Sequence, residues 1–372
     1  MTKRTTKRLL FVVANDRYFC THRLSLALEA QKQGYDVSVA APALGDHHKI
    51  IDAGLNFTPL PFDRGSLNPL KSLKTLVRMM GVFKKFKPDI VHLVALKPVL
   101  LGALAARLTS VPLTIAAISG LGHVFASESW LRTPLRLFLT LLLNNQKTHV
   151  IVQNPEDQAV IEPLGFPNQT HLLLGAGVNT DIFKPCVEPI CPPFIVTHVS
   201  RLLWSKGVGD LVEASKILKS KNIPVVVNVV GVPDTENPDA IPESKLKNWH
   251  DEGFINWLGQ QDDIQAIYQQ SHVAVLASYY REGIPKSLLE ALACGKPIIT
   301  CHMPGCRLTV DDGKNGILVS PRNPQQLADA LQKLYENPEL RSEMGQHSRF
   351  LALDQFSEKT IHQQTLTIYN AI

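Results

Sequence analysis

Two carboxylates separated by a short turn are the part of the sequence best suited to chemistry. Glu282 and Glu290 flank the turn Gly-Ile-Pro-Lys-Ser, in which Pro285 suits the first turn of a helix because its missing N–H is no loss there. The next three backbone amides would be free donors at the positive end of that helix, a ready site for an anion such as a diphosphate. These amides belong to Lys286, Ser287 and Leu288.

The two glutamates indicate a ligand that carries hydroxyl groups as well as phosphate. Glu282 could accept hydrogen bonds from a sugar, and Glu290, further along the helix, from a ribose. A sugar nucleotide contains all three parts. The same pattern also fits an ordinary strand–turn–helix unit with two solvated glutamates, and the residues alone leave both interpretations open.

Two cations belong to the same candidate site. Arg201 and Lys206 lie in a loop after the first strand of the second half, and Glu282 follows a later strand. Ligands of parallel sheets bind at such carboxyl ends. Two cations and a helix end could neutralise a diphosphate without a metal ion, and the sequence has no DxD pair suited to magnesium. We therefore expect no metal and no prosthetic group, although a solvated loop is the alternative for the two cations.

Length, cysteines and charge limit the class of protein. A chain of 372 residues indicates about two domains, and six cysteines without a CxxC pair predict reduced thiols in a cytoplasmic protein. The net charge of +5 is uneven, since residues 1–180 hold 20 Lys and Arg against 11 Asp and Glu. This basic half suits an anionic membrane surface better than nucleic acid, because it lacks interleaved aromatic residues.

A helix predicted over residues 135–145 is the main candidate for membrane contact. Apolar residues nearly encircle it, with Trp130 and Arg132 at its entrance. It could be a core helix of a large domain, or it could lie in a membrane interface through residues 130–143, which we favour. No apolar run reaches the ~20 residues of a spanning helix, and the basic start of the chain does not predict a signal peptide.

Strands and helices alternate along both halves, which predicts an α/β fold of two Rossmann-like, doubly wound parallel sheets facing each other across a cleft. The predicted domains are 1–178 and 194–354, joined by a Gly- and Pro-rich linker at 179–193, with a last helix at about 355–372 that packs back on the first domain. Residues 15–21 are predicted as a loop and 22–33 as a helix. The predicted strands are 9–14, 35–41, 57–61, 88–93, 113–118, 149–153, 172–174, 194–199, 225–230, 255–258, 273–277, 297–300 and 316–319.

A Gly-rich turn, residues 119–123, follows the strand at 113–118. Its position at a carboxyl end of the sheet could bring His123 to a substrate. His123 could equally be a loop histidine with no role.

Taken together, these motifs resemble glycosyltransferase family 4, the retaining enzymes of GT-B fold, over nearly the whole chain. Residues 281–290 fit the family's Glu-x7-Glu signature, and residues 200–207, Ser-Arg-Leu-Leu-Trp-Ser-Lys-Gly, fit its phosphate-binding loop. Residues 150–154 and 119–122 look like the branch that builds lipid-linked surface polysaccharides.

The resemblance implies a role for each residue of the site. Arg201 and Lys206 would bind the diphosphate of the donor, Glu282 would hold donor-sugar hydroxyls, and Glu290 would hold the ribose. The turn between the glutamates would touch sugar and phosphate through Gly283, Ile284, Pro285, Lys286 and Ser287.

Two loops depart from the family pattern. Many members carry a Gly-Gly pair after the first strand, whereas residues 15–23 contain no glycine, and His22 and Arg23 are expected to face the acceptor's phosphates instead. Many relatives have a histidine where Ser119 stands. We expect Ser119 and Gly120 to belong to the donor-sugar pocket, with His123 replacing that histidine in part.

The resemblance implies a cytoplasmic enzyme attached peripherally to the inner face of the plasma membrane. It would move a hexose or N-acetylhexosamine from a UDP-sugar to an undecaprenyl-diphosphate-linked saccharide, with retention and without a metal ion. The alternatives are a GT-B sugar-nucleotide epimerase, which would need no acceptor, and a non-enzymatic two-domain sugar-binding protein.

Overall fold

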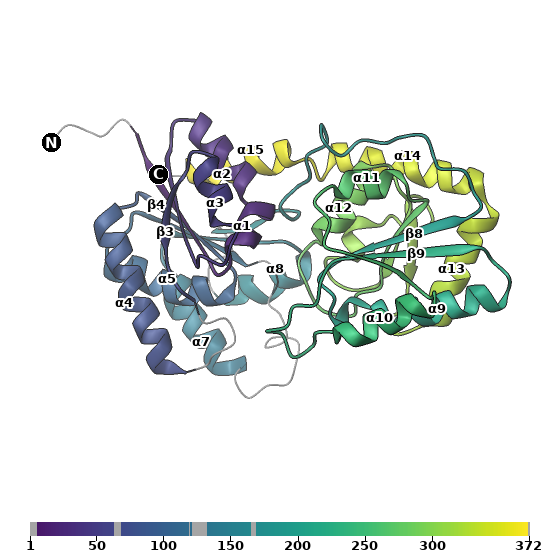
Figure 1. Ribbon diagram of the computed structural model, residues 1–372. Coiled ribbons are helices and arrows are strands. Elements are labelled where there is room, and N and C mark those ends of the chain that lie inside the picture. Colours follow the sequence, from purple (N-terminus) through teal and green to yellow (C-terminus); the bar gives the residue numbers. More distant parts are fainter. Residues whose placement is uncertain (1–5, 63–67, 119, 121–131, 165–168, 371–372) are drawn as a thin grey trace. The chain divides into compact units, whose positions relative to one another are not determined.

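The computed structural model describes residues 6–62, 68–118, 120, 132–164 and 169–370 (Figure 1). The chain forms two compact units. The first unit comprises Met1–Ala176 and Thr360–Ile372, and the second comprises Gly177–Lys359. Each unit is described by itself.

The first unit contains a seven-stranded sheet in the order β3-β2-β1-β4-β5-β6-β7, with every neighbouring pair parallel. Its central strands are apolar runs buried on both faces, as a parallel sheet covered by helices requires. The strands are β1 (Arg8–Val13), β2 (Asp36–Ala41), β3 (Asn56–Pro59), β4 (Ile90–Val94), β5 (Leu113–Ile118), β6 (Thr148–Val152) and β7 (Thr170–Leu172).

Helices cover both faces of this sheet. One face packs against residues of α4, α5, α7 and α8, and the other against residues of α1, α2, α3 and α15. The bounds are α1 (Asp16–His22), α2 (Leu24–Lys32), α3 (His47–Asp52), α4 (Pro69–Phe86), α5 (Leu96–Leu108), α7 (Arg132–Leu143), α8 (Pro155–Ile161), η1 (Glu162–Leu164) and α15 (Glu358–Tyr369).

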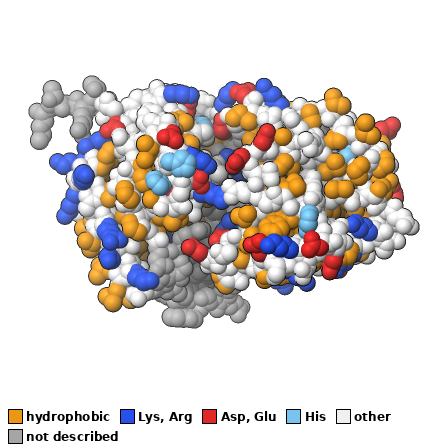
Figure 2. Space-filling view, in the orientation of Figure 1, with side chains coloured by type: hydrophobic (Ala, Val, Ile, Leu, Met, Phe, Trp, Pro, Cys, Tyr) orange, Lys and Arg blue, Asp and Glu red, His pale blue; other side chains and the backbone are white. Residues whose placement is uncertain are grey.

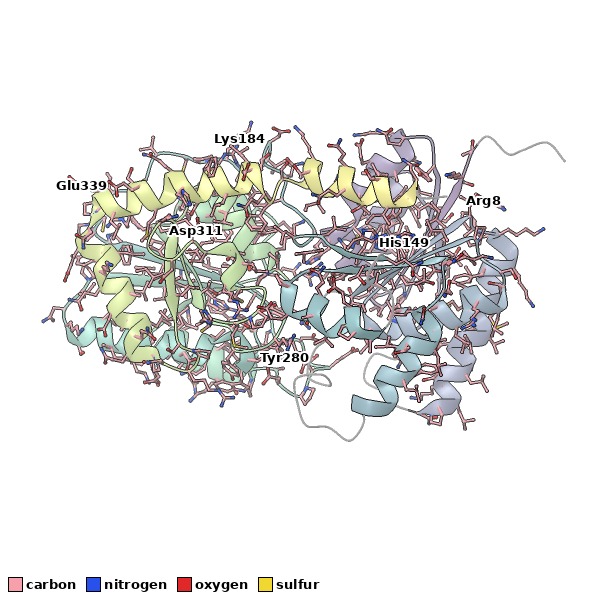
Figure 3. The ribbon with its side chains drawn as sticks, turned by 180° about the vertical axis from the view of Figure 1, so that it is seen from behind. Arg8, His149, Lys184, Tyr280, Asp311 and Glu339 are labelled. Atoms are coloured by element: carbon pink, nitrogen blue, oxygen red, sulfur yellow. The ribbon has the colours of Figure 1, made fainter. Side chains whose placement is uncertain are left out.

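The last turn of α15 completes the core of the first unit. Figure 3 shows this helix in yellow, seen from the side opposite to that of Figure 1. Tyr369 is fully buried, and its hydroxyl lies 2.5 Å from Nδ1 of His92 on β4. Burial, with a smaller contribution from Arg23, holds the pKa of His92 well below its usual range. His92 is therefore neutral, and Tyr369 supplies the polar contact of Nδ1, whereas Nε2 is buried without a hydrogen-bond partner among the described residues.

The second unit contains a six-stranded sheet in the order β10-β9-β8-β11-β12-β13, again parallel throughout. Residues of α9, α10 and α13 share one core with the sheet, and α12 packs against α14. The strands are β8 (Phe194–Val199), β9 (Val225–Val230), β10 (Asn256–Gly259), β11 (Val273–Leu276), β12 (Ile298–Cys301) and β13 (Gly316–Val319). The helices are η3 (Trp204–Lys206), α9 (Val208–Ser220), α10 (Glu243–Asp251), α11 (Ile264–Gln269), α12 (Lys286–Ala293), η4 (Arg307–Thr309), α13 (Pro324–Glu336) and α14 (Pro338–Asp354).

All thirteen predicted strands are present, with ends that shift by a few residues. The prediction of a loop at residues 15–21 was wrong, because Asn15 accepts a hydrogen bond from the amide of Tyr18 at 2.8 Å and starts α1. The helix predicted at 22–33 begins only at Leu24, since the backbone leaves helical geometry at Arg23. All six cysteines are free, and no helix in the described ranges is long and apolar enough to cross a membrane.

Candidate active site

The loop after β8 approaches the end of β11 at Gly207. This glycine has φ +78°, and a Cβ atom at its position would lie 2.1 Å from the carbonyl oxygen of Ala277. A side chain is therefore excluded both by the backbone conformation and by the lack of space. The close approach brings η3, and with it Lys206, to the segment that follows β11.

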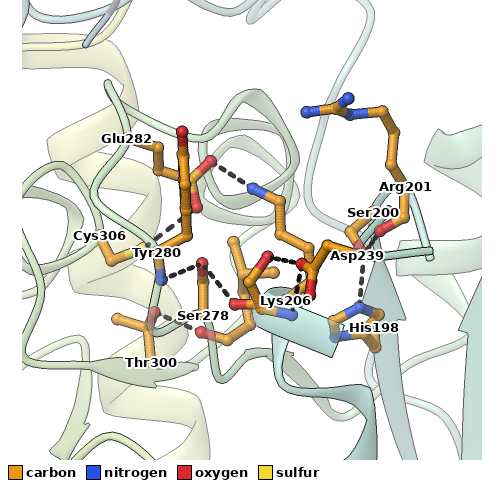
Figure 4. A network of polar contacts seen from close by, with 12 residues as sticks. His198, Ser200, Arg201, Lys206, Asp239, Ser278, Tyr280, Glu282, Thr300 and Cys306 are labelled. Atoms are coloured by element: carbon orange, nitrogen blue, oxygen red, sulfur yellow. Dashed lines mark hydrogen bonds and ion pairs between the residues drawn. The ribbon is translucent and has the colours of Figure 1, made fainter. Parts of the chain in front are cut away.

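Lys206 and Glu282 form an ion pair between the Nζ and Oε2 atoms, shown in Figure 4. Their side chains are only 10% and 17% exposed, so both charges are largely removed from water and each depends on the other. The thiol of Cys306 lies 3.9 Å from the other carboxylate oxygen of Glu282. Burial, followed by the charge of Glu282, raises the pKa of Cys306, so the thiol stays protonated and donates to the carboxylate of Glu282.

A second glycine fixes the backbone next to Glu282. A Cβ atom on Gly305, at φ +81°, would lie 2.1 Å from the carbonyl oxygen of Gly283. The turn itself is packed tightly, since Gly283, Ile284 and Pro285 are all buried. The carboxylate of Glu282 thus projects from a backbone that has little freedom to move.

The helix α12 begins at Lys286, and Pro285, which was predicted in the first turn, is its N-cap residue instead. The prediction of three free amides was wrong for one of them, because the amides of Leu288 and Leu289 both donate to the carbonyl of Pro285, at 3.1 and 3.3 Å. The helical turn closes one residue earlier than a regular i to i−4 bond would allow. The amides that precede this first bond are those of Lys286 and Ser287.

Glu290 lies on α12, eight residues after Glu282. Burial raises the pKa of Glu290 to about 7, and nearby Lys286 opposes this shift only in part. Tyr268, which is fully buried whereas Glu290 is half-buried, donates its hydroxyl to the carbonyl of Ser287 at 2.8 Å, and burial raises its pKa. The carboxyl of Glu290 is therefore poised to change charge near neutral pH.

Arg201 is placed differently from Lys206. Its guanidinium lies 2.8 Å from the carboxylate of Asp234 in the loop after β9, and its side chain is 54% exposed. The structure thus brings Lys206 together with Glu282 directly, whereas Arg201 has an acidic partner of its own. That partner was not found from the sequence, since Asp234 is 33 residues away and belongs to no motif.

Other polar residues that sequence reasoning missed surround the ion pair, and Figure 4 shows them. His198 is buried, and burial together with Lys206 lowers its pKa to about 4, so this imidazole is neutral and pairs with the hydroxyl of Ser200 at 2.7 Å. Asp239 accepts hydrogen bonds from Ser205. Only the Ser200 and Ser205 positions carried a signal in the sequence, through their place in the phosphate-binding loop.

Three of the predicted residues in the first unit lie within the described ranges. His22 is half-buried and stacks on Tyr18 with ring centroids 4.2 Å apart. Arg23 is only 5% exposed, and its Nε atom has no hydrogen-bond partner among the described residues. Gly120 follows β5 with φ +127°.

Ser119, His123 and Trp130 lie outside the described residues. Within the part of the chain that is described, no three His, Cys, Asp or Glu side chains gather in a way that could hold a metal ion.

Two family models match the sequence. The family described as glycosyl transferases group 1 matches residues 189–350, and the one described as glycosyl transferase 4-like matches residues 8–154. A relative from Campylobacter jejuni, named N,N'-diacetylbacillosaminyl-diphospho-undecaprenol alpha-1,3-N-acetylgalactosaminyltransferase, is 30% identical over 353 residues, which cover 91% of each chain. An Escherichia coli relative, UDP-Gal:alpha-D-GlcNAc-diphosphoundecaprenol alpha-1,3-galactosyltransferase, is 27% identical over 82% of this chain and 81% of its own.

Solved structures share the fold over nearly the whole chain. Anabaena Alr3699/HepE in complex with UDP has a TM-score of 0.78 at 18% identity, covering 98% of this chain and all of the other. Sucrose-phosphate synthase from Thermosynechococcus elongatus has a TM-score of 0.77 at 21% identity, covering 98% of both chains.

Proposed function

Because this chain belongs to glycosyltransferase family 4 and has the GT-B fold, we propose that it moves a hexose or N-acetylhexosamine from a UDP-sugar to an undecaprenyl-diphosphate-linked saccharide. The observation that carries the proposal is the ion pair of Lys206 with Glu282 beside the start of α12. It puts a cation for phosphate, a carboxylate for hydroxyl groups and a positive helix end in one place.

The donor's diphosphate would bind Lys206 and Arg201, each of which would exchange a carboxylate partner for a phosphate. Two cations and the first amides of α12 compensate this charge, so we propose a reaction that needs no metal ion. The uridine assignment is supported by the name of the Escherichia coli relative, which specifies UDP-Gal.

The sugar and the ribose would bind the two glutamates. Once Lys206 turns to the diphosphate, Glu282 is free to accept hydrogen bonds from donor-sugar hydroxyls, and Glu290 would accept them from the ribose. The turn from Gly283 to Ser287 would line this pocket, and the resemblance to the family implies that Ser119, Gly120 and His123 also bind the donor.

We propose that transfer retains the anomeric configuration. The acceptor hydroxyl would attack the anomeric carbon on the face from which the diphosphate leaves, and the bond from that carbon to the diphosphate oxygen would break. The acceptor's proton would pass to an oxygen of the leaving diphosphate, whose charge Lys206 stabilises. The acceptor's own phosphates would lie near His22 and Arg23, and the names of both relatives specify a diphospho-undecaprenol acceptor.

We also propose that the enzyme docks on the cytoplasmic face of the plasma membrane, where such an acceptor would be embedded. The helix α7 buries Leu139, Leu142 and Leu143 in the core but exposes Leu137, Phe138 and Leu141 by 62%, 42% and 60%. This is the pattern of a helix that lies in a membrane interface with one face still in the protein.

The helix α4 offers a second surface of the same kind on the same face of the sheet. Leu70, Leu73 and Val77 are 74%, 55% and 60% exposed, and five exposed cations share the helix with no acidic residue. Figure 2 shows Lys and Arg side chains among hydrophobic ones at the edge where Figure 1 places α4. These cations are Lys71, Lys74, Arg78, Lys84 and Lys85.

Liposome flotation tests the docking surface. Changing Leu137, Phe138 and Leu141 to Ser should release the protein from vesicles that contain anionic lipid, because the apolar area inserted in the interface is lost. A matched control changes Phe350 and Leu353 on α14, which are 56% and 50% exposed, to Ser. Undiminished binding of the α7 variant would contradict the proposed docking.

The reaction is tested by measuring nucleotide release across a panel of UDP- and GDP-sugars, with and without undecaprenyl-diphosphate-linked acceptors from a lipid extract. We expect UDP release from one donor, increased by the lipid, and loss of that release in Lys206→Met. Interconversion of one sugar nucleotide without any release would instead indicate the epimerase.

A further inference from the structure

The loop after β9 runs alongside the phosphate-binding loop and pairs with it. The amide of Leu202 donates to the carbonyl of Val232 at 3.1 Å, and the amide of Ile241 donates to the carbonyl of Leu202 at 3.0 Å. An antiparallel bridge joins Leu203 to Ala240, next to the bond between Ile241 and Leu202. The two loops therefore form a short ladder beyond the end of the sheet.

Asp239 forms hydrogen bonds in this ladder through its carboxylate, its carbonyl and its amide. Its carboxylate accepts hydrogen bonds from the amide of Ser205, at 3.0 Å, and from the hydroxyl of the same residue. Its carbonyl accepts the amide of Trp204 at 2.9 Å. Asn237 orients Asp239 in turn, because its side-chain oxygen accepts the amide of Asp239 at 3.0 Å. Hydrogen bonds to an ionised acceptor are stronger than hydrogen bonds between neutral groups, so the carboxylate of Asp239 holds Ser205 firmly in place.

Ser205 also forms hydrogen bonds with the segment that leads to Glu282. Its carbonyl accepts the amide of Tyr279 at 3.0 Å and the hydroxyl of Ser278 at 3.3 Å. Ser205 directly precedes Lys206, and the segment that contains Ser278 and Tyr279 leads to Glu282. Figure 4 shows Asp239, Lys206 and Ser278 within one network of polar contacts.

Side-chain packing holds the loop after β9 at its end, where Ile241 is fully buried in the core, whereas residues 231–240 are half-buried or exposed. The loop borders a cavity of about 550 Å³ whose walls include Val232, Pro233, Asn237, Ile241 and Trp257. A buried core would fix such a loop by close packing, which an open cavity cannot do. The bonds to the phosphate-binding loop are therefore what sets the position of Asp239 relative to Ser205.

We propose that Asp239 is a positioning residue for the donor diphosphate and sugar, acting through Ser205 on Lys206 and Glu282. It does not touch the donor itself. Its carboxylate fixes the amide and the hydroxyl of Ser205, and so fixes the backbone from which Lys206 extends toward Glu282. The inference rests on the proposed function, in that it takes the donor diphosphate as the ligand of Lys206.

The test uses the full chain and measures UDP affinity by calorimetry. Asp239→Leu removes two charge-assisted hydrogen bonds, and we expect UDP to bind at least about tenfold more weakly. Asp239→Asn keeps an oxygen that can accept from both donors without the charge, so it should recover a large part of the affinity. Glu236→Gln is the matched control, since Glu236 is exposed on the same loop.

Steady-state kinetics separates positioning from a general loss of structure. In Asp239→Leu the KM for the donor should rise while the KM for the acceptor stays within about twofold of the wild-type value. Ser205→Ala, which loses only the hydroxyl, should fall between Asp239→Asn and Asp239→Leu. If Asp239→Leu is too unstable to purify, Asp239→Asn and Ser205→Ala still give an ordered series.

Two results would overturn the inference, and they differ from a failure of the proposed function. Wild-type protein that binds UDP together with an Asp239→Leu variant of unchanged affinity would remove the positioning role. Equal increases in the KM of donor and acceptor would show that Asp239 only supports the fold. Failure of the wild-type protein to bind UDP at all would instead overturn the proposed donor, and the inference with it.

Discussion

The charge of Glu290 should control donor affinity near neutral pH. Burial raises the pKa of this carboxyl to about 7, so about one-tenth of it is ionised at pH 6 and about nine-tenths at pH 8. A carboxylate accepts hydrogen bonds from ribose hydroxyls more strongly than a protonated carboxyl does. If only the ionised form binds the ribose, donor affinity rises about tenfold from pH 6 to pH 8.

The measurement is a calorimetric titration of a UDP-sugar at several pH values between these limits. A UDP-sugar is preferred to UDP because the terminal phosphate of free UDP itself titrates near pH ~6. Tyr268, which lies near Glu290, has a raised pKa and stays neutral in this range. His198 has a pKa of about 4 and stays neutral.

The variant Glu290→Gln tests whether Glu290 is the group whose titration controls donor affinity. It keeps a hydrogen-bond acceptor of the same shape but cannot ionise, so its donor affinity should be independent of pH. A Glu290→Gln profile that rises as steeply as the wild-type profile would refute the reasoning, because the titrating group would then lie elsewhere.

The raised pKa of Glu290 affects stability in the opposite direction, because the free energy of unfolding falls as the pH rises. The folded protein holds the proton of Glu290 more tightly than the unfolded chain does, for which the pKa is 4.5. The stabilising contribution is therefore fully present below pH 4.5 and is lost as the pH rises through about 7. Between these values, Glu290→Gln should remove a part of the decline in the free energy of unfolding.

Three substitutions give further tests. Gly207→Ala should lower the free energy of unfolding by at least about 2 kcal/mol, because a Cβ atom at φ +78° would also collide with the carbonyl of Ala277; a urea curve unchanged from wild type would contradict this close approach. Glu282→Gln should reduce kcat/KM for transfer by about 10- to 100-fold through the loss of charge-assisted bonds to the sugar, while UDP affinity stays within about threefold; full transfer activity would exclude the donor-sugar role. Tyr369→Ala should cost about 3–5 kcal/mol in thermal or urea unfolding, as expected for a fully buried aromatic side chain, and a much smaller loss would mean that the last turn of α15 is loosely held.

The sheets could be predicted because their strands are buried on both faces. Such strands appear in the sequence as short apolar runs between turn residues, and β5 and β8 were placed at their observed ends. The helix α1 was missed for the opposite reason, since it is seven residues long and its sequence, Asp-Arg-Tyr-Phe-Cys-Thr-His, has no clear apolar period. Asn15, a typical N-cap residue, could have been used to predict the start of this helix.

The site was predictable where its residues stand in one segment, and not where they come from distant ones. Glu282, Glu290 and the start of α12 lie within nine residues and form a recognisable pattern. The bond that uses the amide of Leu288 depends on backbone angles that residue types do not specify. Asp239 lies 34 residues from Ser205, and only the pairing of two loops beyond the sheet brings them together.

The order in which the segments of the two units follow one another in the chain affects which unit can fold first. The second unit is one continuous segment, Gly177–Lys359, whereas the first needs Thr360–Ile372 to complete it. Ile368 and Tyr369, which fill the core of the first unit, follow the whole second unit in the sequence and so leave the ribosome after it. Domains usually finish folding in the order of synthesis. Here we expect the second unit to finish folding first, because an apolar face of the first unit stays uncovered until residues 360–369 have been synthesised.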